Sequence, residues 1–200
     1  MRKLIVVLAV VFSASAFAQN VTIGTLPQTA SALVATSPAT FVDLTHPATD
    51  AGSINTVIVH WLINGNSCSN AFKVKFIHRN TSGTGFSVIE RGPFTATKGY
   101  VTVQISPPVD VSLGDSIGIT LLQPLSSCGG VTYAPSDPSQ LLWKESGDLG
   151  ATGDFSNGTF IAGETLSAVG RSGSEYLAGV VPAAGATQGV GAFFRTAMQL

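Results

Sequence analysis

Charged residues, cysteines and histidines are all scarce in this sequence. Its 200 residues include ten Lys or Arg, eleven Asp or Glu, three His and two Cys. The few basic residues are spread along the chain, which argues against a nucleic-acid-binding protein, because such proteins normally present a clustered basic face. Beyond the N-terminal segment, no stretch is long and apolar enough to cross a bilayer, for which roughly 20 residues are needed.

The first 18 residues have the three parts of a secretory signal peptide. Two basic residues at positions 2 and 3 precede the apolar core Leu4–Phe12, and Ala16-Phe17-Ala18 forms the cleavage signal. We expect a helical signal peptide that is cut after Ala18, so that the mature chain begins at Gln19. The apolar run is too short for a membrane anchor, and no cysteine lies at the cleavage point to carry a lipid. The sequence therefore predicts export to the periplasm, the cell surface or the medium.

The two cysteines, Cys68 and Cys128, predict a disulfide, because an even pair in an exported chain normally forms one. Closing a loop of about 60 residues would stabilise the fold by roughly 4 kcal/mol in the chain-entropy account. The alternatives are two free thiols or half of a metal site.

Hydrophobic alternation with a period of two residues is the strongest pattern in the sequence. In the stretch 101–122 the alternation is interrupted at Pro107-Pro108 and at the Gly114-Asp115 turn, and it resumes after each. Such alternation is typical of half-buried strands, and no segment shows a helical period over ten residues. Strands are expected at 19–26, 40–44, 54–63, 71–79, 86–91, 101–106, 109–113, 117–122, 131–134, 141–144, 159–162, 165–169 and 175–181. Their regular spacing predicts an all-β fold, a two-sheet antiparallel β-sandwich of jelly-roll type.

Three local features follow from the same pattern. Strands 54–63 and 71–79 are expected to form a hairpin through Asn64-Gly65-Asn66. Gly92-Pro93 is expected to end the strand that begins at Phe86, and residues 147–158, rich in Gly and Asp, to form a surface loop. In strand 71–79, alternation assigns Phe72, Val74 and Phe76 to the core and Lys73, Lys75 and Arg79 to water.

The sandwich domain is assigned to residues 19–181. Residues 182–191 have the composition of a linker, and residues 192–200 have the pattern of one more strand, after which the chain stops without a turn. This last strand either closes onto the sandwich or opens a second β-module that this chain lacks.

Four segments support a resemblance: TFVDLTHPAT, ERGPF, SPPVDVSLGDSIGI and VVPAAGATQGVGAFFRTAMQL. They resemble segments of uncharacterised secreted β-sandwich proteins of environmental bacteria, and the resemblance covers most of the mature chain. In those proteins the VVP…FFRT segment resembles a bridge into a following β-domain. The resemblance implies a bacterial source but no activity. The V-x-V-x-x-GD-x-IG pattern of residues 109–118 also resembles strands of jelly-roll and carbohydrate-binding sandwiches.

One short motif suggests catalysis. Gly114-Asp115-Ser116 matches the nucleophile motif of GDSL-type esterases, which would make Ser116 a nucleophile that needs a base. That family places its histidine late in the chain, in an Asp-x-x-His pattern, whereas the last histidine here, His78, precedes the serine. The family's fold is α/β rather than all-β, so a plain turn is the favoured interpretation. A glycoside hydrolase would need two converging carboxylates, and the candidates are Asp43, Glu90, Asp110, Asp115, Glu145, Glu164 and Glu175.

Metal and cofactor sites are not expected. Metal ligands must converge, but two of the three histidines, His60 and His78, are placed on opposite faces of the expected hairpin. Asp148, Asp154 and Asn157 crowd one Gly-rich loop, as calcium ligands do. Their spacing matches no known calcium loop, so a surface loop is favoured there.

The candidate ligand-binding residues are Trp143, Tyr133 and Tyr100, because flat aromatic faces at a surface can stack on sugar rings. Packing in the core or at its rim is the favoured alternative for Trp143. The sequence thus favours an exported, non-catalytic module with a structural or adhesive role at the cell surface. The alternatives are a carbohydrate-binding module and, more remotely, a secreted glycoside hydrolase or esterase. The sequence leaves the partner open, with polysaccharide or other surface proteins as candidates, and no nucleic acid is expected.

Overall fold

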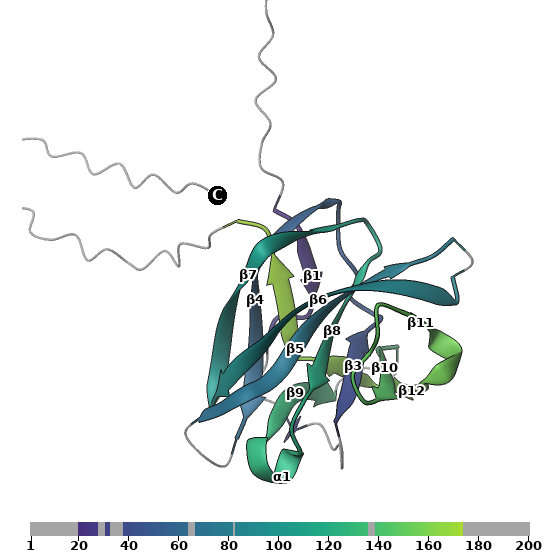
Figure 1. The fold of residues 1–200 in the computed structure, drawn as a ribbon. Coiled ribbons are helices and arrows are strands. Elements are labelled where there is room, and N and C mark those ends of the chain that lie inside the picture. The colour runs from purple at the N-terminus through teal and green to yellow at the C-terminus, as the bar shows by residue number, and fades with distance from the viewer. Residues whose placement is uncertain are drawn as a thin grey trace, which may run out of the picture.

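The computed structural model describes residues 20–27, 31–32, 38–63, 67–81, 83–135 and 139–173. The expected signal peptide with its Ala18–Gln19 cleavage site, the expected strand 175–181 and the linker with its final strand, 182–200, lie outside these residues. Within them the chain is all-β, and two antiparallel sheets pack face to face (Figure 1).

Each sheet has seven strands. In sheet 1 the order is β1 (Thr22–Gly24), β14 (Ala168–Arg171), β4 (Gly52–Leu62), β9 (Gly130–Pro135) and β13 (Glu164–Leu166), with β2 (Ser31–Ala32) on β9 and β7 (Gly99–Val111) on β4. In sheet 2 it is β11 (Thr152–Asp154), β6 (Gly85–Thr97), β5 (Ser67–Arg79), β8 (Ser116–Leu121), β3 (Ala39–Asp43), β10 (Leu141–Ser146) and β12 (Thr159–Ala162). The described helices are two short ones, α1 (Leu125–Cys128) and the 3₁₀ helix η1 (Phe155–Asn157).

The strand pairs are nested in the way that defines a jelly roll. β5 pairs with β6. The strand before them in the chain, β4, pairs with the strand after them, β7, and β3 and β8, which flank these four in the chain, also pair. One long antiparallel ribbon is therefore folded over, so that β4 and β7 lie in sheet 1 while the other four strands lie in sheet 2. The expected jelly-roll sandwich is confirmed.

The expected hairpin between the Trp61 strand and the Phe72 strand is wrong. β4 and β5 lie in opposite sheets, because both edges of β5 are already paired, with β6 and β8. Trp61 and Phe72 instead face each other across the interior, with ring centroids 5.0 Å apart. Alternation correctly assigns both side chains to the core, but alternation does not specify which strand pairs with which.

The proline interruptions are bulges rather than strand ends. In the ladder between β5 and β6, Phe72 lies opposite Phe94 and Val74 opposite Arg91, so Gly92-Pro93 is the excess on β6. The excess on β7 is larger, because the four residues 105–108, which include Pro107-Pro108, lie opposite Asn55 alone on β4. A bulge suits proline because the extra residue needs no ladder N–H. Both strands therefore continue for 13 residues, and the expectation that Gly92-Pro93 ends its strand is wrong.

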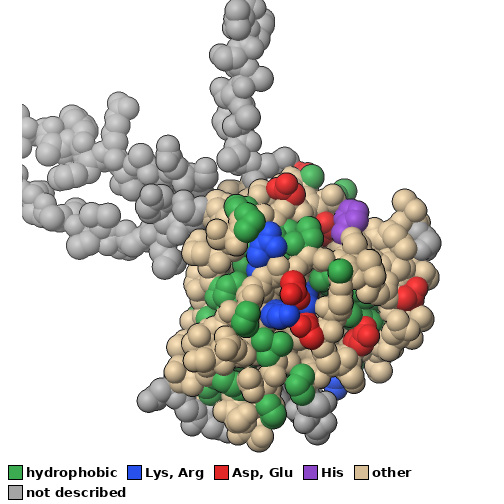
Figure 2. Space-filling model, viewed as in Figure 1, with side chains coloured by type: hydrophobic (Ala, Val, Ile, Leu, Met, Phe, Trp, Pro, Cys, Tyr) green, Lys and Arg blue, Asp and Glu red, His purple; other side chains and the backbone are tan. Residues whose placement is uncertain are grey.

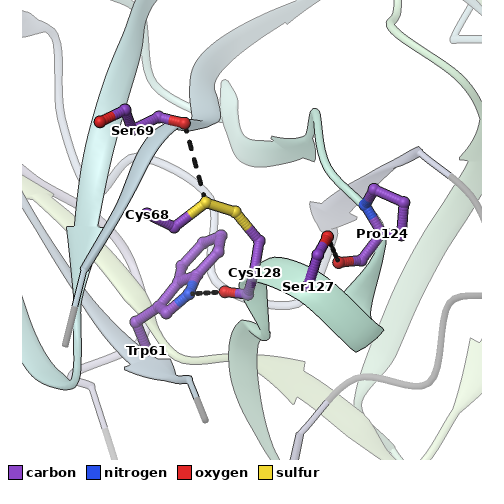
Figure 3. Close-up of a disulfide and its surroundings, with 6 residues drawn as sticks. All are labelled: Trp61, Cys68, Ser69, Pro124, Ser127 and Cys128. Atoms are coloured by element: carbon purple, nitrogen blue, oxygen red, sulfur yellow. Dashed lines mark hydrogen bonds between the residues drawn. A yellow bond between two sulfur atoms is a disulfide. The ribbon is translucent and has the colours of Figure 1, made fainter. Parts of the chain in front are cut away.

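A disulfide between Cys68 and Cys128 ties the two sheets together, as predicted. Cys68 lies near the start of β5 in sheet 2, and Cys128 ends the helix α1 that leads into β9 of sheet 1. Figure 3 shows the Trp61 indole beside this bond, where its N–H donates to the carbonyl oxygen of Cys128 at 2.9 Å. The buried Trp61 side chain thus has a hydrogen-bond partner for its only polar group, next to the disulfide.

The apolar side chains form two clusters instead of one. The larger fills the space between the sheets. The smaller lies on the outer face of sheet 2 and consists of Val42, Ile77, Phe86, Trp143, Leu149 and Phe155. The segment 147–158 lies over this outer cluster and contributes Leu149 and Phe155 to it, so it is a packed cover and not the open surface loop that its composition suggested.

Candidate functional site

A buried carboxylate at the end of β3 has hydrogen-bond partners on both of its oxygens. Asp43 is 0% exposed, and its Oδ2 accepts hydrogen bonds from the hydroxyls of Thr25 at 2.9 Å and Thr165 at 3.0 Å. Its Oδ1 accepts from the backbone N–H groups of Thr45 at 2.9 Å and His46 at 3.1 Å. Since Thr25 follows β1 and Thr165 lies in β13, this cluster joins sheet 1 to sheet 2.

The Asp43–His46 pair does not have the geometry of a proton relay. A relay needs the acid on one ring nitrogen of the histidine and the nucleophile on the other. Here the Asp43 carboxylate and the Thr25 hydroxyl both lie at Nδ1, at 3.0 and 2.7 Å. The cluster is a turn-closing network, which is the usual role of an aspartate that accepts backbone N–H groups two and three residues ahead.

Ser116, the residue of the esterase motif, is out of reach of a substrate. Its side chain is 0% exposed in β8, and its hydroxyl has no hydrogen-bond partner among the described residues. Asp115 closes the preceding turn by accepting from the N–H of Ser112 at 2.8 Å, and its other oxygen lies 2.7 Å from His78 Nδ1. The favoured interpretation of this motif as a turn is confirmed.

The other candidate carboxylates are dispersed or engaged. Glu145 lies in β10 of sheet 2 and Glu164 in β13 of sheet 1, and burial raises the pKa of each. Asp154 caps η1, where its side chain accepts from the N–H of Ser156 at 2.8 Å. Glu175 lies outside the described residues. In the part of the chain that the structure describes, no three His, Cys, Asp or Glu side chains come together as a metal site.

Four charged side chains form a ring on the outer face of β5 and β6. Lys75 is 0% exposed and donates to Glu90, to Asp148 at 2.6 Å and to the carbonyl oxygen of Leu149 at 2.8 Å. Lys73 lies 3.1 Å from Glu90 and 2.6 Å from Asp148. Figure 2 shows basic and acidic side chains gathered on this face. The expectation that Lys75 faces water is wrong, because segment 147–158 covers it.

The ring perturbs the pKa of three of its members. Hydrogen bonds from Lys75, and then from Lys73, lower the pKa of Glu90. Burial alone would raise the pKa of Asp148, but hydrogen bonds from Lys73 and Lys75 outweigh it and lower that pKa. The hydrogen bond to Asp148 raises the pKa of Lys73. Both carboxylates are thus held ionised by the lysines. A hollow of about 350 Å³ lies next to the ring, and the charged side chains in its lining already form ion pairs with one another.

The three candidate aromatic residues do not form one platform. Trp143 is 0% exposed in the outer cluster of sheet 2, where its N–H donates to the carbonyl oxygen of Phe155 at 2.9 Å. Tyr100 is 59% exposed, but it lies in sheet 1, where its ring meets that of His60 at 4.9 Å between centroids. Tyr133 is in β9 of the same sheet, and its side chain lies outside the described part of the structure. The favoured packing of Trp143 in a core is confirmed.

A groove on sheet 2 is the site that the sequence did not indicate. Two hollows of about 410 Å³ each share Leu44 and Arg79 in their linings, and we call them together the Arg79 groove. The first hollow continues along Leu141, Asp154, Phe155 and Phe160, and the second along Pro47, His78, Leu113 and Asp115. Each volume lies in the range of small-molecule sites, roughly 300–1,000 Å³.

The exposed side chains of the groove are of mixed chemistry. Phe160 is 51% and Leu113 72% exposed, which makes each of the two hollows partly apolar. Between them lies Arg79, whose guanidinium sits 5.2 Å from the centroid of the Phe155 ring. Among the described residues Arg79 forms no ion pair. The groove therefore combines flat apolar surface with a fixed, unpaired cation.

Comparison with known proteins adds no assignment. No family model matches the chain, and no curated protein or solved structure is significantly similar to it. The resemblance to secreted bacterial sandwich proteins stays a prediction. Among the described residues no helix is long and apolar enough to span a bilayer, and the disulfide is compatible with an extracellular location.

Proposed function

We propose that this protein is an exported, non-catalytic β-sandwich module with an adhesive role at the cell surface, and that it adheres through the Arg79 groove. The observation behind the proposal is that Phe160, Leu113 and Arg79, which has no ion pair with any described residue, lie along one hollowed face. Single exposed apolar side chains are ordinary, whereas several that line one groove are typical of interaction sites. The signal-peptide pattern of residues 1–18 and the disulfide support export.

The non-catalytic part of the proposal rests on how the reactive groups are used. The Ser116 hydroxyl is buried, the Asp43 carboxylate closes a turn, and Lys75 has three acceptors for its three N–H groups. Asp43 and Lys75 therefore serve the stability of the sandwich, and the Ser116 hydroxyl is out of reach of a substrate. The Arg79 groove is the surface that remains for a partner, and its apolar and charged lining is suited to binding.

The test is adhesion of the full chain, produced by export, to an insoluble fraction of bacterial envelopes. The double variant Arg79→Ala/Phe160→Ala should lose at least about tenfold in affinity, which corresponds to about 1.4 kcal/mol. The matched control is Lys98→Ala/Tyr100→Ala, which removes an exposed cation and an exposed aromatic ring outside the groove. Equal adhesion of both variants would contradict the proposal and favour a purely structural role, in which the groove binds nothing.

A further inference from the structure

Phe160 is a half-exposed aromatic ring of the groove, whereas the Phe155 ring in the same lining is buried. It lies in β12 directly opposite Trp143 of β10, so the two rings share the outer face of sheet 2. Trp143 is fully buried in the outer cluster, whereas Phe160 is half exposed. The Phe160 ring therefore presents exposed apolar surface to the first hollow of the groove, which it lines.

Arg79 supplies hydrogen-bond donors that no described residue uses. It occupies the last position of β5, on the face that also carries Lys73, Lys75 and Ile77. Its guanidinium lies 5.2 Å from the centroid of the Phe155 ring, an arrangement that fixes a planar cation. A guanidinium has five N–H donors, and here they lie between the two hollows.

Asp154 supplies acceptors in the same hollow. Its carboxylate accepts from the N–H of Ser156 at 2.8 Å and also from the side chains of Ser156 and Thr84, and the Ser156 N–H is the main reason that its pKa is lowered. The group is therefore ionised at neutral pH. A carboxylate has about four acceptor positions, and three are used here, so about one remains for a ligand.

The charged groups of the groove together determine which ligand charge it accepts. An anion would pair with Arg79 but would meet the carboxylates of Asp154 and Asp115, and a cation would face the guanidinium. A hydroxyl group satisfies both sides, because it accepts from a guanidinium and donates to a carboxylate. A ring with hydroxyl groups on its edge and C–H groups on its face also matches the flat surface of Phe160.

We propose that the Arg79 groove binds a neutral, hexose-based polysaccharide, with one pyranose ring stacked on Phe160 and its hydroxyl groups shared between Arg79 and Asp154. This inference rests on the proposed adhesive function and specifies the class of its partner. The length of the groove, with a second hollow beyond Arg79, favours a chain of sugars over a single residue.

Affinity electrophoresis of the full exported chain tests the inference. Native gels would contain one of four neutral polymers (dextran, laminarin, hydroxyethyl cellulose or galactomannan) or the polyuronate alginate. We expect at least one neutral polymer to retard the protein. Phe160→Ala, Arg79→Ala and Asp154→Ala should each weaken that retardation at least about fivefold, while Tyr100→Ala, the matched exposed aromatic in sheet 1, should leave it unchanged.

Three results would overturn the inference: no retardation by any of the four neutral polymers, retardation that Phe160→Ala does not change, or stronger retardation by alginate. A thermal melt of each variant separates lost binding from lost fold, and Asp154→Asn, which retains an acceptor for the η1 cap, replaces Asp154→Ala if the latter unfolds. Envelope adhesion that depends on Arg79 and Phe160 without any retardation would leave the adhesive function standing and remove the neutral polysaccharide.

Discussion

Lys75 places a positive charge fully out of solvent on the outer face of sheet 2. A buried charge is costly unless it is paired and fully hydrogen-bonded. Lys75 meets this condition with Glu90, Asp148 and the Leu149 carbonyl oxygen. Two of these acceptors belong to segment 147–158, so one side chain of β5 fixes the start of the segment that covers the outer cluster.

Removing the Lys75 side chain should therefore loosen that segment. We expect Lys75→Ala to lower the free energy of unfolding by about 2–3 kcal/mol, because buried hydrogen bonds are lost and a cavity is left. Lys73→Ala, which alters a more exposed member of the same ring, should cost less than about 1 kcal/mol. Urea unfolding curves of the two variants measure both values, and equal costs would contradict the role given to Lys75.

The same ring predicts acid sensitivity. The folded-state pKa values of Glu90 and Asp148 are lowered from ordinary values of 4.5 and 3.8. Folding thus favours the deprotonated carboxylates, and their contribution is complete above about pH 4.5 and is lost as the pH falls through the lowered values. Urea midpoints should fall between pH 5 and pH 3, and Glu90→Gln should reduce that fall. An unchanged pH dependence in Glu90→Gln would show that the ring does not contribute.

At the scale of elements, the outer cluster depends on how closely segment 147–158 approaches β10. Gly158 lies against the Trp143 indole and the Lys144 carbonyl oxygen, so a side chain there would overlap both. Its backbone is extended, so the requirement for glycine is one of space and not of backbone conformation. At Gly150, in the same segment, an added methyl group would meet a single backbone oxygen, 3.9 Å away.

This contrast gives a paired prediction. Gly158→Ala should destabilise the fold by about 1–3 kcal/mol through overpacking, whereas Gly150→Ala should change it by less than about 0.5 kcal/mol. Thermal or urea unfolding monitored by tryptophan fluorescence measures both. Equal stability of the two variants would contradict the close packing of this segment on Trp143.

At the scale of the whole molecule, the two sheets are joined covalently at one place. The Cys68–Cys128 bond closes a loop with a sequence separation of 60 residues. We expect the double variant Cys68→Ser/Cys128→Ser to lose about 2–4 kcal/mol of stability relative to the oxidised protein. Thiol titration of the denatured, exported protein should find no free thiol, and two free thiols would contradict the disulfide.

Much of this architecture follows from the sequence pattern, because period-two alternation reports directly which side of a strand is buried. It places Phe72, Val74 and Phe76 in the core and locates most strands. It cannot place β4 and β5 in different sheets, because pairing depends on contacts far apart in the chain. It also misses the cover over Lys75, because two apolar residues, Leu149 and Phe155, lie scattered among Gly and Asp.

The candidate site was harder to predict than the fold, and for the same reason. The Arg79 groove is assembled from the end of β3, the end of β5, the turn at 113–115 and the segment 154–160. None of these segments has a recognisable motif for binding. The aromatic residues that composition made conspicuous, Trp143 and Tyr100, lie on different sheets, whereas Phe160 became a candidate only when its exposure and its neighbours were known.

The proposed function depends above all on where the binding surface lies, and an amide-resolved NMR titration locates that surface residue by residue. Isotope-labelled protein would be titrated in turn with cellohexaose, laminarihexaose, maltohexaose and mannohexaose. We expect at least one sugar to shift the resonances of residues 78–79, 154–156 and 160 while those around Tyr100 in β7 stay in place. Shifts centred on Tyr100 and β7 would contradict the assignment of binding to the Arg79 groove, and no shifts with any of the four sugars would contradict a neutral, hexose-based ligand.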